Sequence, residues 1–280
     1  MTARDEHLSA IRQRWPEVDV ASFDPIGGGW DCFTYRVGGW VFQFPRPGAD
    51  EGLRKQIASL PELAREVSAA IPVPVYVADD IPCMGYRWIE GVPMSAETEG
   101  IWPERLGRFL YDLHLVPPEF VGMRAPSPAA VRDEHRREVA DLADHVLPLL
   151  TAHERATAAA LIDGFFDDDE NFRFAVCLTH GDIGPEHVLV SDRGDLAGVI
   201  DWGDLQVGDP AWDLAWLVHA MPEHGARVLG AYGGPPDDRF LARCRFGFTM
   251  MPWHEVQHGR VSDQPAFVER GLDGVRARLG

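Results

Sequence analysis

The order of apolar and polar positions in the first third of the chain predicts short β-strands. Residues 33–37 (FTYRV) and 40–44 (WVFQF) are strand-like runs, and the Gly-Gly pair between them is typical of a tight hairpin turn. Residues 71–78 (IPVPVYVA) and 84–91 (MGYRWIEG) predict further strands. The prolines of the first of these favour a place at a sheet edge or entry, because proline cannot donate to a strand ladder.

Farther along the chain the spacing of apolar residues becomes helical. Residues 102–116 (WPERLGRFLYDLHLV), 131–150 and 154–166 predict amphipathic helices, and residues 51–70 predict a helix interrupted by Pro61. In the first of these segments one stripe is formed by Leu106, Phe109, Leu110, Leu113 and His114.

Strands followed by helices predict a two-lobed α+β fold. We place the boundary near Glu90–Pro93. This gives an N-terminal lobe with its linker, residues 1–91, and a C-terminal lobe, residues 92–280.

Charge narrows the range of partners. The net charge is −18, which argues against nucleic-acid binding because phosphate backbones require a basic surface. Residues 1–90 carry −4 and the remainder −14. An acidic second half can attract a cationic small molecule, although acidic surfaces also serve solubility alone.

The sequence gives no sign of a membrane or secretory protein. It has no uninterrupted apolar run of the roughly 18 residues that a membrane helix needs, and residues 1–15 lack the apolar core of a signal peptide. The four cysteines have no paired spacing. We therefore expect a cytoplasmic protein with reduced thiols and no membrane partner.

The densest chemistry lies in residues 178–190, LTHGDIGPEHVLV. This stretch predicts a strand, a loop containing Asp182, and a second strand, and a later strand ends at Asp201. Asp182 and His187 keep the spacing of base and metal ligand in a kinase catalytic loop, with His in place of Asn. Asp201, nineteen residues after Asp182, is placed like the second metal-binding carboxylate of a kinase.

Phosphoryl transfer requires these residue types for a physical reason. Negative charge builds on the transferring oxygens, and Mg²⁺ held by hard ligands neutralises it. A carboxylate must also orient the attacking hydroxyl and accept its proton.

These motifs together resemble the aminoglycoside phosphotransferase family, antibiotic kinases with a protein-kinase-like fold. The resemblance rests on HGDIGPEHVLV, GVIDWGDLQVGDPAWDLA and LGRFLYDLHLVP, with IGGGWDCFTYRVGGWVFQFPR and IPVPVYV in the first lobe. It implies that Asp182 is the catalytic base and that His187 and Asp201 bind Mg²⁺. Histidine at position 187 is similar to what macrolide phosphotransferases show. Structural roles are expected for His180, Asp209 and Asp213.

The resemblance also implies a nucleotide site, for ATP or GTP, in the first lobe. The Gly27-Gly28-Gly29 turn would cover the phosphates, because glycine allows close backbone approach. The base would lie against the linker segment Tyr86–Glu90, which includes Trp88, and bond to its backbone.

Two positions depart from the family pattern. Gln43 stands where the family has a phosphate-anchoring cation, and Gln56 stands where that cation has its carboxylate partner. We expect the two amides to face each other and form hydrogen bonds. The alternative is a misaligned strand, with Arg46 or Lys55 contacting the phosphates. The two glutamines also leave open a non-catalytic binding protein of the same fold.

The acceptor is expected beside Asp182, in the C-terminal lobe. Trp253, His254, Glu255 and the helix at 132–149 are the candidate lining. A carboxylate and an aromatic ring suit a cationic molecule, so we rank aminoglycosides and basic peptide antibiotics first. Macrolides, suggested by His187, and a metabolic small molecule are the alternatives.

Overall fold

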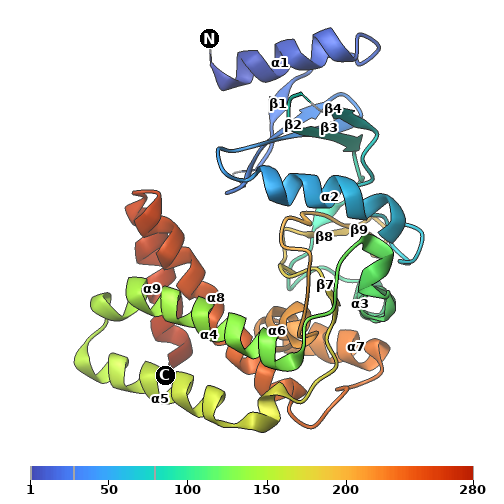
Figure 1. Ribbon diagram of the computed structural model, residues 1–280. Coiled ribbons are helices and arrows are strands. Elements are labelled where there is room, and N and C mark those ends of the chain that lie inside the picture. The colour runs from blue at the N-terminus through green and yellow to red at the C-terminus, as the bar shows by residue number, and fades with distance from the viewer. Residues whose placement is uncertain (1, 28, 79, 280) are drawn as a thin grey trace.

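The N-terminal part of the protein is an antiparallel sheet with the strand order β1-β2-β3-β5-β4 (Figure 1). The computed structural model describes residues 2–27, 29–78 and 80–279. The strands of this sheet are β1 (Asp24–Pro25), β2 (Cys32–Val37), β3 (Trp40–Pro45), β4 (Tyr76–Ala78) and β5 (Cys83–Arg87). The hairpin predicted at the Gly-Gly pair is confirmed, since Val37 lies opposite Trp40.

Proline shortens the strand expected at residues 71–78. Only Tyr76–Ala78 pairs with β5, at the edge of the sheet as predicted. The N–H of Val75 still donates to the carbonyl oxygen of Gly85 (2.8 Å), but Pro72 and Pro74 have no N–H to donate, so regular pairing does not extend back through them.

Helices cover the two faces of this sheet (Figure 1). α1 (Ala3–Arg14) begins with a capping box between Thr2 and Asp5 and packs Ile11 against one face. It was not among the predicted elements, because only two of its residues are buried. α2 (Asp50–Leu63) packs Leu53 against the other face.

The interruption expected at Pro61 is displaced by two residues. Pro61 lies inside α2, in its last turn, and the helix ends at Leu63. Proline lacks its own N–H and so removes one helical hydrogen bond, and only Glu62 and Leu63 continue the helix beyond it.

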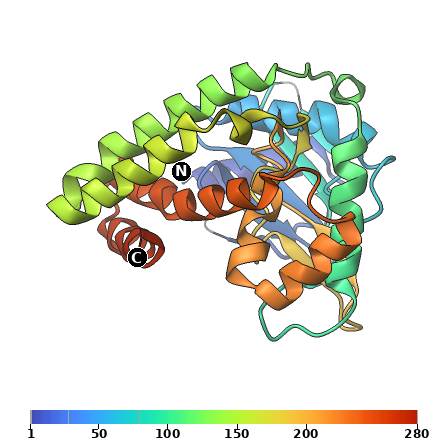
Figure 2. The ribbon, with the colours of Figure 1, turned by 90° about the horizontal axis from the view of Figure 1, so that it is seen from below.

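The C-terminal part is mainly helical, which confirms the two-part α+β class. Its helices are α3 (Trp102–Leu115), α4 (Pro128–Val146), α5 (Ala152–Asp167), α6 (Ala211–Ala220), α7 (Pro222–Tyr232), α8 (Phe240–Val261) and α9 (Pro265–Leu279). The 3₁₀ turns are η1 (Pro118–Val121), η2 (Leu147–Leu149) and η3 (Asp169–Phe172). The four apolar residues of the stripe predicted in α3 are fully buried, and α3 packs on α7. Figure 2 shows α4 running along α8.

Short strands lie between the large sheet and the helices. β6 (Val92–Pro93), β8 (Val188–Val190) and β9 (Leu196–Val199) form one small sheet, and β7 (Cys177–Thr179) pairs with β10 (Gln206–Gly208). Figure 1 shows β8 and β9 directly below α2. The loops that follow β7 and β9 therefore face the N-terminal sheet.

Buried carboxylates connect these loops to the helices. Asp213 of α6 accepts hydrogen bonds from the N–H groups of His180 and Gly181 (2.8 Å each) and lies 3.1 Å from Nε2 of His114 in α3. Asp209 accepts a hydrogen bond from Nε of Arg243 in α8 (2.6 Å). These pairings fix the end of β7 and the start of α6 relative to α3 and α8.

No helix in the described part of the chain has both the length and the apolar character that crossing a bilayer requires.

The contact between α3 and α7 can be tested at Gly107. A Cβ at this position would lie 2.2 Å from the carbonyl oxygen of Val228, so Gly107→Ala should lower the free energy of unfolding by about 1–3 kcal/mol. Gly164 of α5 is the matched control. No described atom lies within 4 Å of its Cβ position, so Gly164→Ala should raise that free energy by about 0.5–1 kcal/mol. Denaturant unfolding of both variants measures this, and shifts of the same sign would contradict the packing.

The buried imidazole of His180 should make stability depend on pH. Burial lowers the pKa of His180 from 6.5 to about 4, so the unfolded chain binds a proton that the folded protein does not. The contribution of the neutral His180 ring to the free energy of unfolding is therefore complete above pH 6.5 and is lost as the pH falls toward 4. His180→Gln removes this titration, so its melting temperature should fall less steeply over that range.

The control for this experiment is His153→Gln, which changes an exposed histidine of α5. Its curve of melting temperature against pH should run parallel to that of the wild type. A parallel curve for His180→Gln as well would show that His180 is not the titrating group.

Candidate active site

The loop after β7 is held in place by the ring of His180. The chain turns at Gly181 (φ +88°), where a Cβ would lie 2.6 Å from the carbonyl oxygen of Asp204. Nδ1 of His180 accepts a hydrogen bond from the N–H of Asp182 (3.2 Å). Nε2 must then carry the proton, and it donates to the carbonyl oxygen of Ile200 (3.1 Å). One neutral ring thus positions Asp182 and the residue before Asp201.

Asp201 adopts a backbone conformation that is uncommon for a residue with a side chain. Its φ is +65°, in the left-handed region. The neighbouring Trp202 is fully buried, and its indole N–H donates to the carbonyl oxygen of Val199 (3.0 Å). This anchor and His180 together hold the turn that directs the Asp201 carboxylate toward the loop of Asp182.

His187 lies between the two aspartates. Its Nδ1 is 2.8 Å from the carbonyl oxygen of Asp182 and 3.3 Å from Oδ2 of the same residue. Its Nε2 is 3.7 Å from Oδ2 of Asp201. The structure therefore brings together the three residues for which the sequence predicts transfer chemistry.

The electrostatics of this group reflect crowding of negative charge. Burial raises the pKa of Asp182 to about 6, the positive charge of His187 opposes this, and Asp204 and Asp201 raise it further. Burial alone would lower the pKa of His187, but Asp182 and Asp201 raise it above its ordinary value. The site thus has a surplus of carboxylates and attracts cations.

The donor set is compatible with Mg²⁺ if a substrate completes it. The N–H at Nδ1 of His187 is directed at the Asp182 carbonyl, so Nε2 is the nitrogen that faces the Asp201 carboxylate, and it can bind a metal only when the ring gives up its second proton. No group of three or more His, Cys, Asp or Glu side chains suited to a metal occurs among the described residues. Mg²⁺ characteristically takes one or two protein carboxylates and completes its shell with phosphate oxygens and water.

The glycine turn is anchored on both sides. Gly27 has φ +70° and open space around it, and Gly28 lies outside the described residues. The carbonyl oxygen of Gly29 accepts a hydrogen bond from Nε of Arg46 (3.1 Å). Trp30 stacks on His258 of α8, with ring centroids 3.8 Å apart and planes 6° from parallel. The turn is therefore joined to the C-terminal helices.

The linker residues differ in their availability to a ligand. Tyr86 is buried in β5, and the N–H of Trp88 already donates to the carbonyl oxygen of Gly39 (3.0 Å). The N–H of Trp88 is therefore not available to a base, while its side chain is partly exposed. The N–H groups of Ile89 and Glu90 have no hydrogen-bond partner within the described chain.

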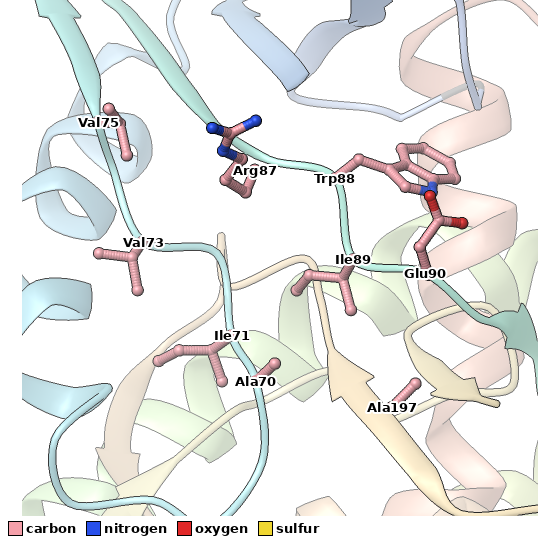
Figure 3. Close-up of a pocket in the computed structure, with 9 residues that line it drawn as sticks. All are labelled: Ala70, Ile71, Val73, Val75, Arg87, Trp88, Ile89, Glu90 and Ala197. Carbon is pink, nitrogen blue, oxygen red and sulfur yellow. The ribbon is translucent and has the colours of Figure 1, made fainter. Parts of the chain in front are cut away.

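A cavity of about 440 Å³ adjoins the linker but is separate from the transfer residues. In Figure 3, Trp88 and Glu90 lie on one side of the linker, and Arg87 and Ile89 lie on the other. The cavity is lined by residues of the linker, of the segment before β4, and of β9: Ala70, Ile71, Val73, Val75, Arg87, Trp88, Ile89, Glu90 and Ala197.

Gln43 of β3 and Gln56 of α2 do not form the expected hydrogen bonds with each other. Both are buried, and Oε1 of Gln43 has no partner among the described residues. Nε2 of Gln56 is directed elsewhere. A Cβ at Gly203 would lie 4.0 Å from this nitrogen, 3.7 Å from Oδ1 of Asp201 and 3.9 Å from Oδ2 of Asp31. Gln56 is thus part of the surroundings of Asp201.

The predicted acceptor residues have three different environments. Trp253 is 1% exposed in the helical core, so its ring cannot contact a ligand as expected. Glu255 forms an ion pair with Arg270 of α9, which neutralises it. His254 is 37% exposed, and its Nε2 lies 3.6 Å from Oε1 of Glu138 in α4. Helical spacing alone could not distinguish these three sides of α8.

Three carboxylates at the site were not singled out from the sequence. Asp31 lies beside the Asp201 loop and Asp204 belongs to it, and the pKa of Glu138 is raised by burial and further by the charges of Glu134 and Asp204. The signal for Asp204 was its place in the motif IDWGD, three residues after Asp201. Glu138 lies in the helix at 132–149 that is expected to line the acceptor site, but no pattern within that helix distinguishes this residue from its neighbours.

Comparison with known proteins agrees with this architecture. The family model described as the phosphotransferase enzyme family matches residues 22–241. Viomycin phosphotransferase of Streptomyces vinaceus is 30% identical over 122 residues, which are 41% of this chain and 40% of that protein. The uncharacterised YcbJ of Bacillus subtilis is 40% identical over 67 residues, 24% of this chain and 22% of that one. The similar stretches thus span less than half of either relative.

Solved structures are similar over nearly the whole chain. The GDP complex of aminoglycoside 2′-phosphotransferase-IIIa has a TM-score of 0.86, with 23% identity and 99% of each chain covered. Macrolide 2′-phosphotransferase from Brachybacterium faecium has a TM-score of 0.73, with 23% identity, covering 97% of this chain and 98% of that one. The fold is shared with both, and the match over residues 22–241 shows that this chain belongs to the phosphotransferase enzyme family.

Proposed function

We propose that this protein is a kinase that transfers the γ-phosphate of a Mg-nucleotide to a hydroxyl group of a cationic small molecule, an antibiotic. The convergence of Asp182, His187 and Asp201 carries the proposal, since Nδ1 of His187 lies 2.8 Å from the Asp182 carbonyl and Nε2 lies 3.7 Å from Asp201. A base beside a pair of metal ligands is the arrangement that phosphoryl transfer needs.

Asp182 acts as the base in this mechanism. Its carboxylate accepts the proton of the acceptor hydroxyl while the hydroxyl oxygen attacks the γ-phosphorus. The bond from that phosphorus to the bridging oxygen breaks, and the nucleoside diphosphate leaves. A pKa of about 6 leaves Asp182 mostly ionised at neutral pH and makes it a stronger base than an ordinary aspartate.

His187 and Asp201 hold Mg²⁺ in this proposal, and the ion when bound neutralises charge on the phosphates. His180 fixes the distance between the Asp182 loop and the Asp201 loop through two hydrogen bonds, one to each loop. It does so as a neutral ring, because burial lowers its pKa.

The two lobes divide the substrates between them. We assign the nucleotide to residues 1–91, with the glycine turn over the phosphates. The N–H groups of Ile89 and Glu90, which have no partner within the described chain, are available to the base. The acceptor belongs to residues 92–280. Support for this division comes from β6, which begins at Val92 and pairs with β8 rather than with the N-terminal sheet.

Glu138 and Asp204 favour a cationic acceptor. Glu138 is 45% exposed, and its neighbour His254 is kept neutral because burial lowers the pKa of that ring. The Glu138 carboxylate is therefore not neutralised by His254 and can pair with an ammonium group. Similarity to a relative named for viomycin supports an antibiotic, and we extend the assignment to aminoglycosides and basic peptide antibiotics.

Asp182→Asn tests the base. Transfer to a hydroxyl acceptor should fall by about 100-fold or more, because the amide cannot accept the proton, while Mg-nucleotide binding should remain. The assay is nucleotide consumption with ATP or GTP against aminoglycosides, viomycin and macrolides. Asp192→Asn, an exposed aspartate in the β8–β9 loop, is the control and should keep full activity. Undiminished turnover by Asp182→Asn would refute the mechanism.

Glu138→Gln tests the acceptor site. The KM for a cationic acceptor should rise about threefold to tenfold, because one partly exposed charge pair is lost, while the KM for nucleotide stays constant. Glu223→Gln, on the exposed surface of α7, is the control. Equal KM values in both variants would place the cation elsewhere, and turnover of macrolides alone would favour the second candidate acceptor class.

A further inference from the structure

Lys55 is the single lysine of this chain. The sequence contains 26 Lys and Arg residues, and every one except Lys55 is an arginine. Lysine differs from arginine in presenting a compact point charge rather than a planar fork. The position of this one ammonium group is therefore a specific feature of the protein.

The helix α2 directs Lys55 toward the transfer site. Gly52, Lys55, Gln56 and Ser59 share one face of the helix, because residues three and four apart are neighbours on a helix surface. A Cβ at Gly52 would lie 3.8 Å from the carbonyl oxygen of Gly203, and Nε2 of Gln56 also lies beside Gly203. This face of α2 thus meets the loop that carries Asp201 and Asp204.

Lys55 experiences the charge of three carboxylates but forms no ion pair with them in the described structure. Burial lowers the pKa of Lys55, while the charges of Asp204, Glu51 and Asp31 act in the opposite direction. Within the described residues, Lys55 is in none of the ion pairs, which extend to 4.0 Å, and donates no hydrogen bond. Lys55 is partly exposed, so its ammonium group is available to a ligand.

A polyphosphate bound here needs cationic partners. The loops around Gly203 present Asp31, Asp201 and Asp204, which repel a phosphate unless positive charge lies between them. Gln43, at the corresponding place in β3, is neutral. Arg46 is tied to the glycine turn rather than to α2, since its Nε donates to the carbonyl oxygen of Gly29 and its guanidinium lies 4.2 Å from the centroid of the Phe33 ring.

We propose that Lys55 of α2 binds the phosphates of the nucleoside triphosphate, and that it is the protein's own cation at this site. The proposal rests on the proposed kinase function. Lys55 contributes positive charge to the phosphates from α2. The residue of β3 at this site, Gln43, is uncharged and cannot do so.

The single lysine permits a direct labelling experiment. The intact protein is treated with an amine-reactive acylating reagent, with and without saturating Mg·ATP or Mg·GTP, and the peptide containing Lys55 is quantified by mass spectrometry. We expect nucleotide to reduce the labelling rate of Lys55 by about tenfold and to leave the N-terminal amine unchanged as internal reference. An equal rate with bound nucleotide would overturn the assignment of Lys55.

Variants separate a phosphate contact from a structural role. Lys55→Gln should weaken Mg-nucleotide binding, measured by titration calorimetry, by about tenfold, because a charge-assisted hydrogen bond is lost. Binding of the nucleoside without phosphates should be unchanged. Arg54→Gln is the matched control, since it removes one positive charge from an exposed neighbour on α2 and should leave both affinities unaltered.

Different results would refute the role of Lys55 and the proposed kinase function. Unaltered nucleotide affinity in Lys55→Gln, with a wild type that binds and turns over, would refute Lys55 alone. A parallel loss of nucleoside and nucleotide binding would show that Lys55 serves the fold instead. A wild type that binds no nucleotide would overturn the proposed function and the role of Lys55 together.

Discussion

The buried carboxylate of Asp213 is the interaction on which the geometry of the site depends. It is fully enclosed, and it accepts two backbone N–H groups from the loop after β7. Burial alone would raise its pKa, but the hydrogen bond and charge of His114 lower it overall. An enclosed charge is stable only with such partners, so the loop is fixed where it can supply them. His180 then extends this constraint to Asp182 and to the turn before Asp201.

The second organising constraint is negative charge. Carboxylates from both parts of the chain gather around the loops after β7 and β9, and they raise one another's pKa values. Such a cluster costs free energy unless cations enter it. In our proposals these are Mg²⁺ between His187 and Asp201, the amine of the acceptor beside Glu138, and Lys55 at the phosphates. The preference for positively charged ligands thus follows from the surplus of carboxylates at the site.

Prediction from sequence succeeded where local pattern and structure share one cause. The hairpin at the Gly-Gly pair, the buried stripe of α3 and the edge position of β4 follow from turn chemistry, helical period and the missing N–H of proline. It failed where side chains on one helix diverge. Trp253, His254 and Glu255 are consecutive, so they point to the core, toward α4 and toward α9 respectively.

The sequence by itself determined the two-part fold, the family, and the spacing of Asp182, His187 and Asp201, because motifs and periodicities are local properties of the chain. Only the tertiary structure decided which charges meet. Through the packing of the helices the charge of Asp204 acts on Glu138, and through the packing of α2 on the Asp201 loop the charge of Asp31 acts on Lys55. These pairs are separated by tens of residues along the chain, and Coulomb forces depend on distance in space, which no local pattern specifies.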